Sequence, residues 1–270
     1  MISGREVEGF FRGKRKFIPN PIYMHIEKKR RGFEYYQILV LLKNVPGNIT
    51  EMTKYLETKG YNVIAMRSYV LDEVTVLTYY LEVAETSHAS AEMLRNDLSK
   101  IKNLLNVKVV KMTKTGQFDA FHFPLVFKDT RMLAVTDEVF YSLRKQLLDT
   151  LESGGAVMLY NTGLKAGSTL FNQLLSETED IEDQLLTIQD IFRAFGWGIV
   201  EIKGFTLTSR EGEIIIEENL EAKELDRFKC HFTRGVLTGL IRRILEDDSI
   251  RMDETHCKSM GDDYCRFVMS

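Results

Sequence analysis

The chain has 270 residues, of which 44% are hydrophobic and 28% are charged. This composition is typical of a soluble globular protein, and the length suits one large domain or two smaller ones. The formal net charge of −3 gives no overall attraction to nucleic acid. Because we find neither a signal peptide nor a run of about 18 apolar residues, we expect a cytoplasmic protein with no membrane-spanning helix.

The first 32 residues are a basic leader. Eight lysines or arginines lie between Arg12 and Arg31 with a single acid, and Pro19 and Pro21 interrupt the segment. Such a segment is typical of an arm that binds nucleic acid or an acidic partner, or of a solvated leader that packs a few aromatic residues on the body. We favour the solvated leader, since short basic runs are weak signals of binding.

Residues 33–113 predict a ferredoxin-like unit with the element order βαββαβ. β-Branched and aromatic residues predict its strands, and apolar residues at helical spacing predict its helices. The expected elements are strands at 35–44, 61–71, 73–84 and 107–112 and helices at 49–60 and 87–105. Asn48 or Thr50 is the expected cap of the first helix and Ser87 of the second, because a short polar side chain can accept from a free helix N–H.

Residues 114–270 predict a second unit of mixed α/β structure, so the whole chain is expected to be α+β. Short strands are expected at 121–127 and 131–136, a hairpin at 197–219 and two strands after residue 249. The expected helices are 137–152, 155–175, 184–196 and 224–245. Apolar residues at 139, 143, 147 and 151 form the expected buried stripe of the first of these helices.

Glycines mark two of these helices. Gly163 and Gly167 are expected to break or soften the helix at 155–175. In the helix at 224–245, Cys230, Gly235 and Gly239 form a side of small residues, which another element can approach closely.

The three cysteines are Cys230, Cys257 and Cys265. A hairpin would bring the last two together, and with Glu254 the three thiols would supply four ligands, the number that a closed structural zinc site uses. His256, His231 and Asp262 are alternative fourth ligands. Spacing alone leaves open a metal site, buried thiols and, less favoured in a chain with few cysteines, a disulfide.

Three patterns in the second unit resemble the 4-vinyl reductase (4VR) domain family. They are Leu-Tyr-x2-Gly-x3-Gly from Leu159, Cys-x4-Gly-x3-Gly from Cys230, and Glu-x2-Cys-x3-Gly-Asp-x2-Cys-x-Phe from Glu254. The resemblance covers roughly residues 118–270 and implies an α/β domain that binds small hydrophobic molecules. Such domains are the sensors of aromatic-responsive bacterial activators and are related to vesicle-tethering TRAPP subunits.

For the cysteines, the resemblance implies a structural zinc ion held by Cys230, Glu254, Cys257 and Cys265. It also implies a hydrophobic or aromatic small-molecule ligand. Apolar pockets are lined by aromatic residues, and ordinary core residues are the alternative reading of any one of them. The candidate pocket residues are Tyr160, Phe171, Phe192, Phe195, Trp197 and Phe205.

Residues 35–113 resemble an ACT domain, a βαββαβ module that binds amino acids and regulates enzymes. The loop with Asn44, Pro46, Gly47 and Asn48 is similar to the family's Asp-x-Pro-Gly-x-Leu loop, with Asn44 in place of the acid. Its free N–H groups would receive a carboxylate at the helix start. The resemblance implies edge-to-edge dimerisation, an amino-acid site, or both.

Motifs for a serine nucleophile, a P-loop and a dinucleotide site are absent. His122 has no recognisable acid partner in the sequence, and we expect it to be structural. We therefore expect a non-enzymatic sensor or regulator. The alternatives are an enzyme or accessory factor of cofactor or tetrapyrrole metabolism, and an assembly module without a small ligand.

Overall fold

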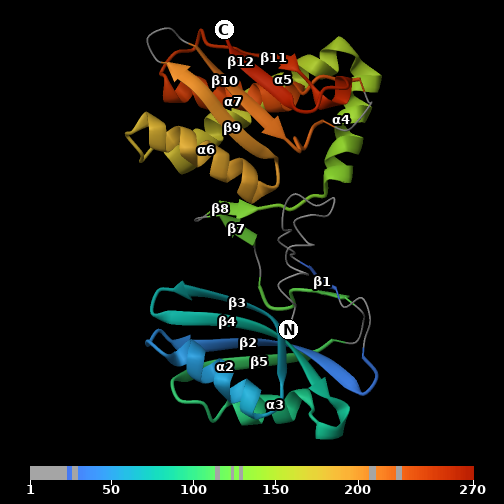
Figure 1. Cartoon of the computed structure of the whole chain (residues 1–270), viewed down its shortest axis with the longest axis vertical. Coiled ribbons are helices and arrows are strands. Elements are labelled where there is room, and N and C mark those ends of the chain that lie inside the picture. Colours follow the sequence, from blue (N-terminus) through green and yellow to red (C-terminus); the bar gives the residue numbers. More distant parts are fainter. Residues whose placement is uncertain are drawn as a thin grey trace. The chain divides into compact units, whose positions relative to one another are not determined.

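The computed structural model describes residues 23–25, 30–112, 116–122, 125–127, 130–206, 211–222 and 227–270. The chain divides into two compact units, Met1–Met132 and Leu133–Ser270 (Figure 1). Most of the expected basic leader lies outside the described residues, and the expected boundary after residue 113 lies inside the first unit. No helix among the described residues combines the length and the hydropathy needed to cross a bilayer.

The first unit confirms the ferredoxin-like prediction. It consists of β2 (Phe33–Lys43), α2 (Asn48–Thr58), β3 (Asn62–Leu71), β4 (Val74–Ala84), α3 (Ala91–Leu98) and β5 (Leu104–Lys111). The strands form an antiparallel sheet in the order β3-β4-β2-β5. Both helices pack on one face of this sheet, where Met52, Leu56, Leu94 and Leu98 are fully buried (Figure 1).

Shorter elements complete the first unit. A 3₁₀ turn, η1 (Glu85–Ser87), follows β4. The strand β1 (Tyr23–His25) pairs with β6 (Gly116–Phe118), and β7 (Leu125–Phe127) pairs with β8 (Thr130–Met132).

Both expected helix caps of the first unit are wrong. Gly47, in a left-handed conformation with φ 89°, precedes α2, and no side chain caps this helix. Ser90 caps α3 by accepting from the Met93 N–H, because the 3₁₀ turn takes up Ser87 and delays the helix.

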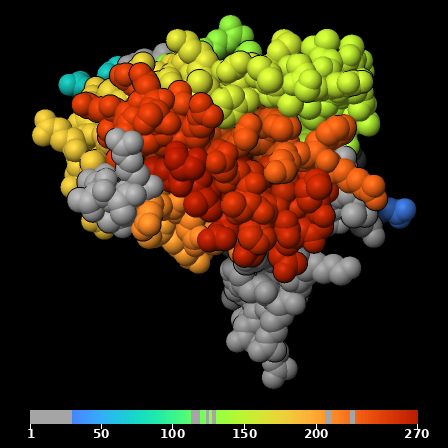
Figure 2. All heavy atoms as spheres, turned by 90° about the horizontal axis from the view of Figure 1, so that it is seen from above, coloured from blue at the N-terminus to red at the C-terminus, as the bar shows by residue number. Residues whose placement is uncertain are grey.

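The second unit begins with helices. They are α4 (Asp137–Leu151), α5 (Ser153–Leu170), a π-helical turn η2 (Phe171–Leu175) and α6 (Ile181–Phe195). The hairpin β9 (Ile199–Thr206) and β10 (Glu211–Glu217) comes next, followed by α7 (His231–Ile244), β11 (Met252–His256), the 3₁₀ turn η3 (Lys258–Met260) and β12 (Cys265–Met269). The sheet is antiparallel in the order β11-β12-β10-β9. Residues of the C-terminal part of the chain, orange to red, form much of the face seen in Figure 2.

Helices α5 and α7 cross through glycines. A Cβ on Gly163 or Gly167 would overlap the backbone of Phe232 or Val236, and one on Gly235 or Gly239 the carbonyl of Tyr160 or Leu164. The expected close approach on the side of Gly235 and Gly239 is therefore confirmed. The expected break in α5 is wrong, because its glycines serve this contact within a continuous helix.

Two expectations for the flanking helices are also wrong. Helix α7 begins at His231, with Cys230 as its N-cap residue, rather than at residue 224. In α4 the buried residues are Arg144 and Leu148, whereas Val139 and Leu143 are 53% and 59% exposed. The buried side is therefore displaced by one residue from the expected stripe, because partners in the fold stabilise the charge of Arg144.

Candidate metal centre and ligand cavity

A hairpin and a helix start bring together four potential metal ligands. Glu254 lies in β11 opposite Phe267, and Cys265 begins β12 opposite Ile216 of β10. Cys257 directly follows β11, beyond an irregularity in the ladder between Glu254 and His256. Cys230 reaches the hairpin from the N-terminus of α7.

The ligand atoms of Cys230, Glu254, Cys257 and Cys265 lie within 4.8 Å of one another, and all four residues are buried. The Cys230 Sγ is 3.5 Å from the Cys257 Sγ and 3.8 Å from the Cys265 Sγ. Zinc–sulfur bonds of about 2.3 Å in tetrahedral geometry separate two sulfurs by about 3.8 Å. The residues therefore fit a small tetrahedral metal ion. All three cysteines are free, so the disulfide alternative is wrong.

Glu254 provides an independent test of this fit. Its Oε2 accepts the Cys230 N–H at 2.9 Å, whereas its Oε1 is buried and has no hydrogen-bond partner within the described chain. Burial and the Cys257 thiol raise the pKa of Glu254 to about 8. A buried carboxylate oxygen without a partner is costly, and a cation among the three sulfurs would supply one.

The thiols differ in acidity. Hydrogen bonds from Cys230 and Cys257 lower the pKa of Cys265 to about 4, and the contacts with Cys257 and Cys265 raise the pKa of Cys230. The cluster thus stabilises a thiolate before any metal binds, and the thiolate is the form of cysteine that binds metals.

The turn between Cys257 and Cys265 accounts for the spacing of the ending. Gly261 has φ 108°, a conformation that favours glycine. The Asp262 Oδ2 accepts the Cys257 N–H at 2.7 Å and so orients that ligand. Asp262 and His256 lie outside the four-residue cluster, as does His231, so Glu254 is the fourth residue of the set.

A buried polar network surrounds the start of α7, and the sequence did not reveal it. Glu221 accepts the Phe232 N–H at 3.1 Å and the Thr233 N–H at 2.7 Å. The Arg144 Nε donates to the same carboxylate at 3.3 Å, and both side chains are fully buried. Burial raises the pKa of Glu221 to about 7, although Arg144 and the two amides lower it.

The six expected pocket residues do not form one site. Phe192, Phe195 and Trp197 pack together, with the Trp197 ring centroid 5.6 and 5.5 Å from those of the two phenylalanines. Tyr160 lies under the Arg234 guanidinium, and Phe205 covers Gly212. Of the six, Phe171 alone lines the cavity described next.

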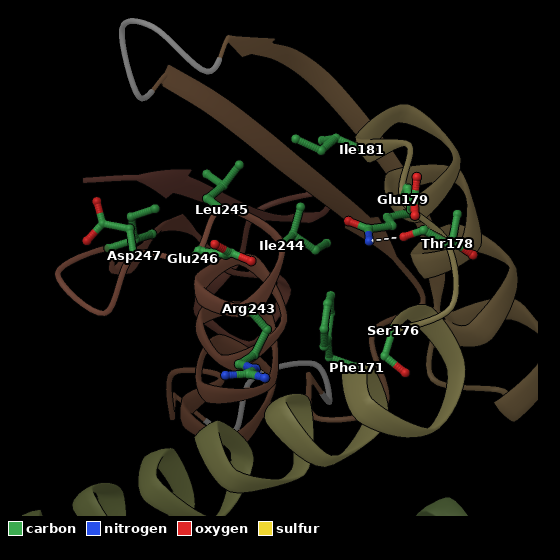
Figure 3. Close-up of a pocket in the computed structure, with 12 residues that line it drawn as sticks. Phe171, Ser176, Thr178, Glu179, Ile181, Arg243, Ile244, Leu245, Glu246 and Asp247 are labelled. Carbon is green, nitrogen blue, oxygen red and sulfur yellow. Dashed lines mark hydrogen bonds between the residues drawn. The ribbon is translucent and has the colours of Figure 1, made fainter.

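A cavity of about 720 Å³ lies between the C-terminal end of α7 and the segment joining α5 to α6 (Figure 3). Its apolar wall includes Phe171, Ile181, Ile244, Leu245 and Ile250, and its polar residues are Ser176, Thr178, Glu179, Gln184, Arg243, Glu246 and Asp247. Because Cys230 precedes the other end of α7, one helix connects the metal cluster with the cavity. This volume is within the usual range for small-molecule sites.

In the first unit, the side chains of the ACT-like loop bond within the fold. The Asn48 Nδ2 donates to the Lys43 carbonyl at 2.7 Å, and its Oδ1 accepts from Asn103 at 3.2 Å. The Asn44 Oδ1 accepts from Thr75 at 3.1 Å. These bonds shape the turn around Gly47, and Pro46 is exposed.

His122 does have an acid partner. Its Nδ1 lies 2.8 Å from the Asp119 Oδ2, and the Asp119 Oδ1 accepts from Gln37 at 3.1 Å. The partner is three residues away in a loop without regular structure, so no periodicity marked the pair. These bonds join the loop to the sheet of the first unit, as expected for a structural histidine.

Solved structures with similarity to the chain cover each unit. The phenol-responsive sensory domain of the activator PoxR, solved with phenol, is 17% identical, with 52% of this chain and 76% of that chain covered and a TM-score of 0.45. A vinyl-4-reductase family protein from Methanocaldococcus jannaschii is 19% identical over 53% of this chain and 84% of that chain, with a TM-score of 0.39. An ACT domain protein from Streptococcus pneumoniae is 18% identical over 29% and 89%, with a TM-score of 0.26.

No curated protein sequence matches the chain. The family model of the vinyl-4-reductase (4VR) domain matches residues 213–270, from β10 through β12, and this segment contains all four residues of the candidate metal cluster.

Proposed function

We propose that the protein is a small-molecule-binding regulator whose second unit is stabilised by a structural zinc ion. Cys230, Glu254, Cys257 and Cys265 would hold the ion. The observation that carries this proposal is the buried Glu254 Oε1 without a partner in the described chain, beside three clustered sulfurs and inside the segment that the family model matches. Four protein ligands leave no open coordination position, which supports a structural rather than a catalytic metal.

The metal assignment predicts that Cys265→Ser loses about one equivalent of zinc and is less stable than the wild type, since structural zinc contributes directly to folding. Elemental analysis of the purified proteins and thermal unfolding measure both effects. Ser270→Ala, an exposed position at the end of the same hairpin, is the control and should retain the metal. Equal zinc content in Cys265→Ser and the wild type would show that the cluster is not the site.

For the ligand, we propose that the cavity beside Phe171 and Ile181 holds a hydrophobic or aromatic molecule. Its apolar wall and its volume support this proposal, and phenol is a suitable first probe. Ile181→Trp should weaken phenol binding in titration calorimetry by filling the cavity. Leu186→Trp, on an exposed position of the same helix, should leave the affinity unchanged. Equal binding by both variants would place the ligand elsewhere.

A second candidate function is assembly with another protein chain. It is favoured by the exposed apolar side of α4, where Val139 and Leu143 are 53% and 59% exposed. For the ACT-like unit we propose dimerisation in preference to amino-acid binding, because the side chains of Asn44 and Asn48 are already bonded within the fold. A native mass spectrum showing a dimer with no bound small molecule would favour assembly over sensing.

A further inference from the structure

The backbone that presents Cys230 is fixed on both sides by one buried ion pair. We propose that Arg144 and Glu221 are positioning residues for the metal centre, and that through them metal binding stabilises the docking of α4. This inference rests on the proposed zinc site. Neither residue belongs to the ligand cluster, and they come from different segments of the chain.

On the N-terminal side of Cys230, Arg144 bonds to two successive peptide groups. Its Nη2 donates to the Phe228 carbonyl at 3.1 Å and to the Lys229 carbonyl at 3.3 Å. The guanidinium carbon also lies 5.6 Å from the centroid of the Phe228 ring. A planar guanidinium with donors in a fixed fork can hold several acceptors at once. The Lys229 carbonyl is part of the peptide group that leads into Cys230, so Arg144 limits where the cysteine Cα can lie.

On the C-terminal side, Glu221 holds the first turn of α7 through the N–H groups of Phe232 and Thr233. Asn219 extends this support, because its Oδ1 accepts from the Glu221 N–H and from the Thr233 hydroxyl, both at 3.1 Å. The Arg144–Glu221 contact at 3.3 Å joins the two supports into one network. Cys230 itself adds a direct bond from its N–H to Glu254. The direction of its thiol is therefore set in large part by groups outside the metal cluster.

Arg144 is the main polar link between α4 and this region among the described residues. The rest of the inward side of α4 includes Leu148, which is buried, and Phe140, whose ring packs edge-on against Phe232 at 5.4 Å. A buried guanidinium is stable only while its acceptors keep their places. Loss of the metal would free Cys230 and its neighbouring peptide groups, and so weaken the acceptors of Arg144. Because coupling between two equilibria is reciprocal, displacing α4 would weaken metal binding in turn.

The test measures zinc affinity separately from stability. Arg144→Met keeps the bulk of the side chain and removes the fork, and we expect zinc binding about tenfold weaker or more in competition with a chelator of known affinity. Lys145→Met is the matched control: it removes a charge from the next residue of α4, which is half-exposed and pairs with Asp149 at the surface, and its affinity should equal that of the wild type. Arg144→Lys should restore part of the affinity, since an ammonium cannot satisfy all the acceptors together. Glu221→Gln keeps the shape and should also weaken zinc binding, which provides a second variant if Arg144→Met does not fold.

Hydrogen exchange of the wild-type protein tests the coupling without a substitution. On zinc removal, the amides of residues 140–148 should exchange faster by a larger factor than those of α6. Unchanged zinc affinity in both variants, or no greater effect on α4 than on α6, would overturn the inference and leave Arg144 as a purely structural residue. Absence of zinc binding by the wild type would instead refute the proposed metal centre, and this inference with it.

Discussion

At the residue scale, Glu254 separates a metal centre from a group of buried thiols. Three buried cysteines behave as small hydrophobic residues and need no ion. A buried carboxylate differs, because each of its oxygens needs a donor or a cation. The Oε2 of Glu254 has the Cys230 N–H, whereas the Oε1 has no hydrogen-bond partner among the described residues. The same reasoning explains why the neighbouring Asp262 is no ligand, since it caps the Cys257 N–H.

His231, next to the metal cluster, gives the stability a dependence on pH. Burial, followed by the charges of Arg234, Arg144 and Lys229, lowers the pKa of His231 to about 4. The folded protein therefore holds this ring neutral, and its contribution to stability is present above the usual pKa of about 6.5 and is lost as the pH falls toward 4.

We predict that His231→Gln, which cannot take up a proton, loses less stability than the wild type between pH 7 and pH 4. Because the ring is only partly buried, the difference should be about 1–2 kcal/mol rather than the full value of the shift. Urea unfolding across this range measures it. Any acid release of zinc affects both proteins, so the difference between the two curves isolates the histidine. Parallel curves would contradict the prediction.

At the scale of elements, the α5–α7 crossing shows what residue spacing can and cannot predict. Glycines four residues apart indicated a surface open to close approach, and the structure shows why both helices need them. The same pattern did not reveal that the two glycine-bearing surfaces face each other. Arg144 was missed for a related reason: its partners Glu221, Phe228 and Lys229 are far away in sequence, and helical periodicity favours the neighbouring leucines as core.

Gly235→Ala should destabilise the second unit by about 3 kcal/mol, since the added Cβ would overlap the Tyr160 carbonyl and neither backbone can shift freely. Gly154→Ala is the matched control in α5, where a Cβ meets only the Leu151 Cβ at 3.8 Å. Since alanine is the better helix former, this variant should be neutral or more stable by up to about 1 kcal/mol. Denaturant unfolding of both variants measures the effect, and equal stabilities would contradict the close packing of α5 on α7.

At the scale of the whole molecule, the two units differ in what holds them together. The first is stabilised by a sheet covered by α2 and α3, and its order of elements was predictable because strand and helix patterns alternate cleanly. The second has a core shared by α6, α7 and its sheet, and the cysteines lie in that core. The boundary between them was harder to predict, because Asp119 bonds to Gln37 and so joins residues after the expected boundary to the first sheet.

These differences predict two unfolding transitions that respond differently to metal removal. A strong zinc chelator should lower the transition temperature of residues 133–270 and leave that of the first unit unchanged, because the four proposed ligands all belong to the second unit. Calorimetry with and without chelator measures both transitions, and hydrogen exchange assigns each to its unit. Cys265→Ser should reproduce the low transition and should not respond further to the chelator. If the chelator lowered both transitions equally in this variant as well, its effect would not come from the Cys3Glu cluster.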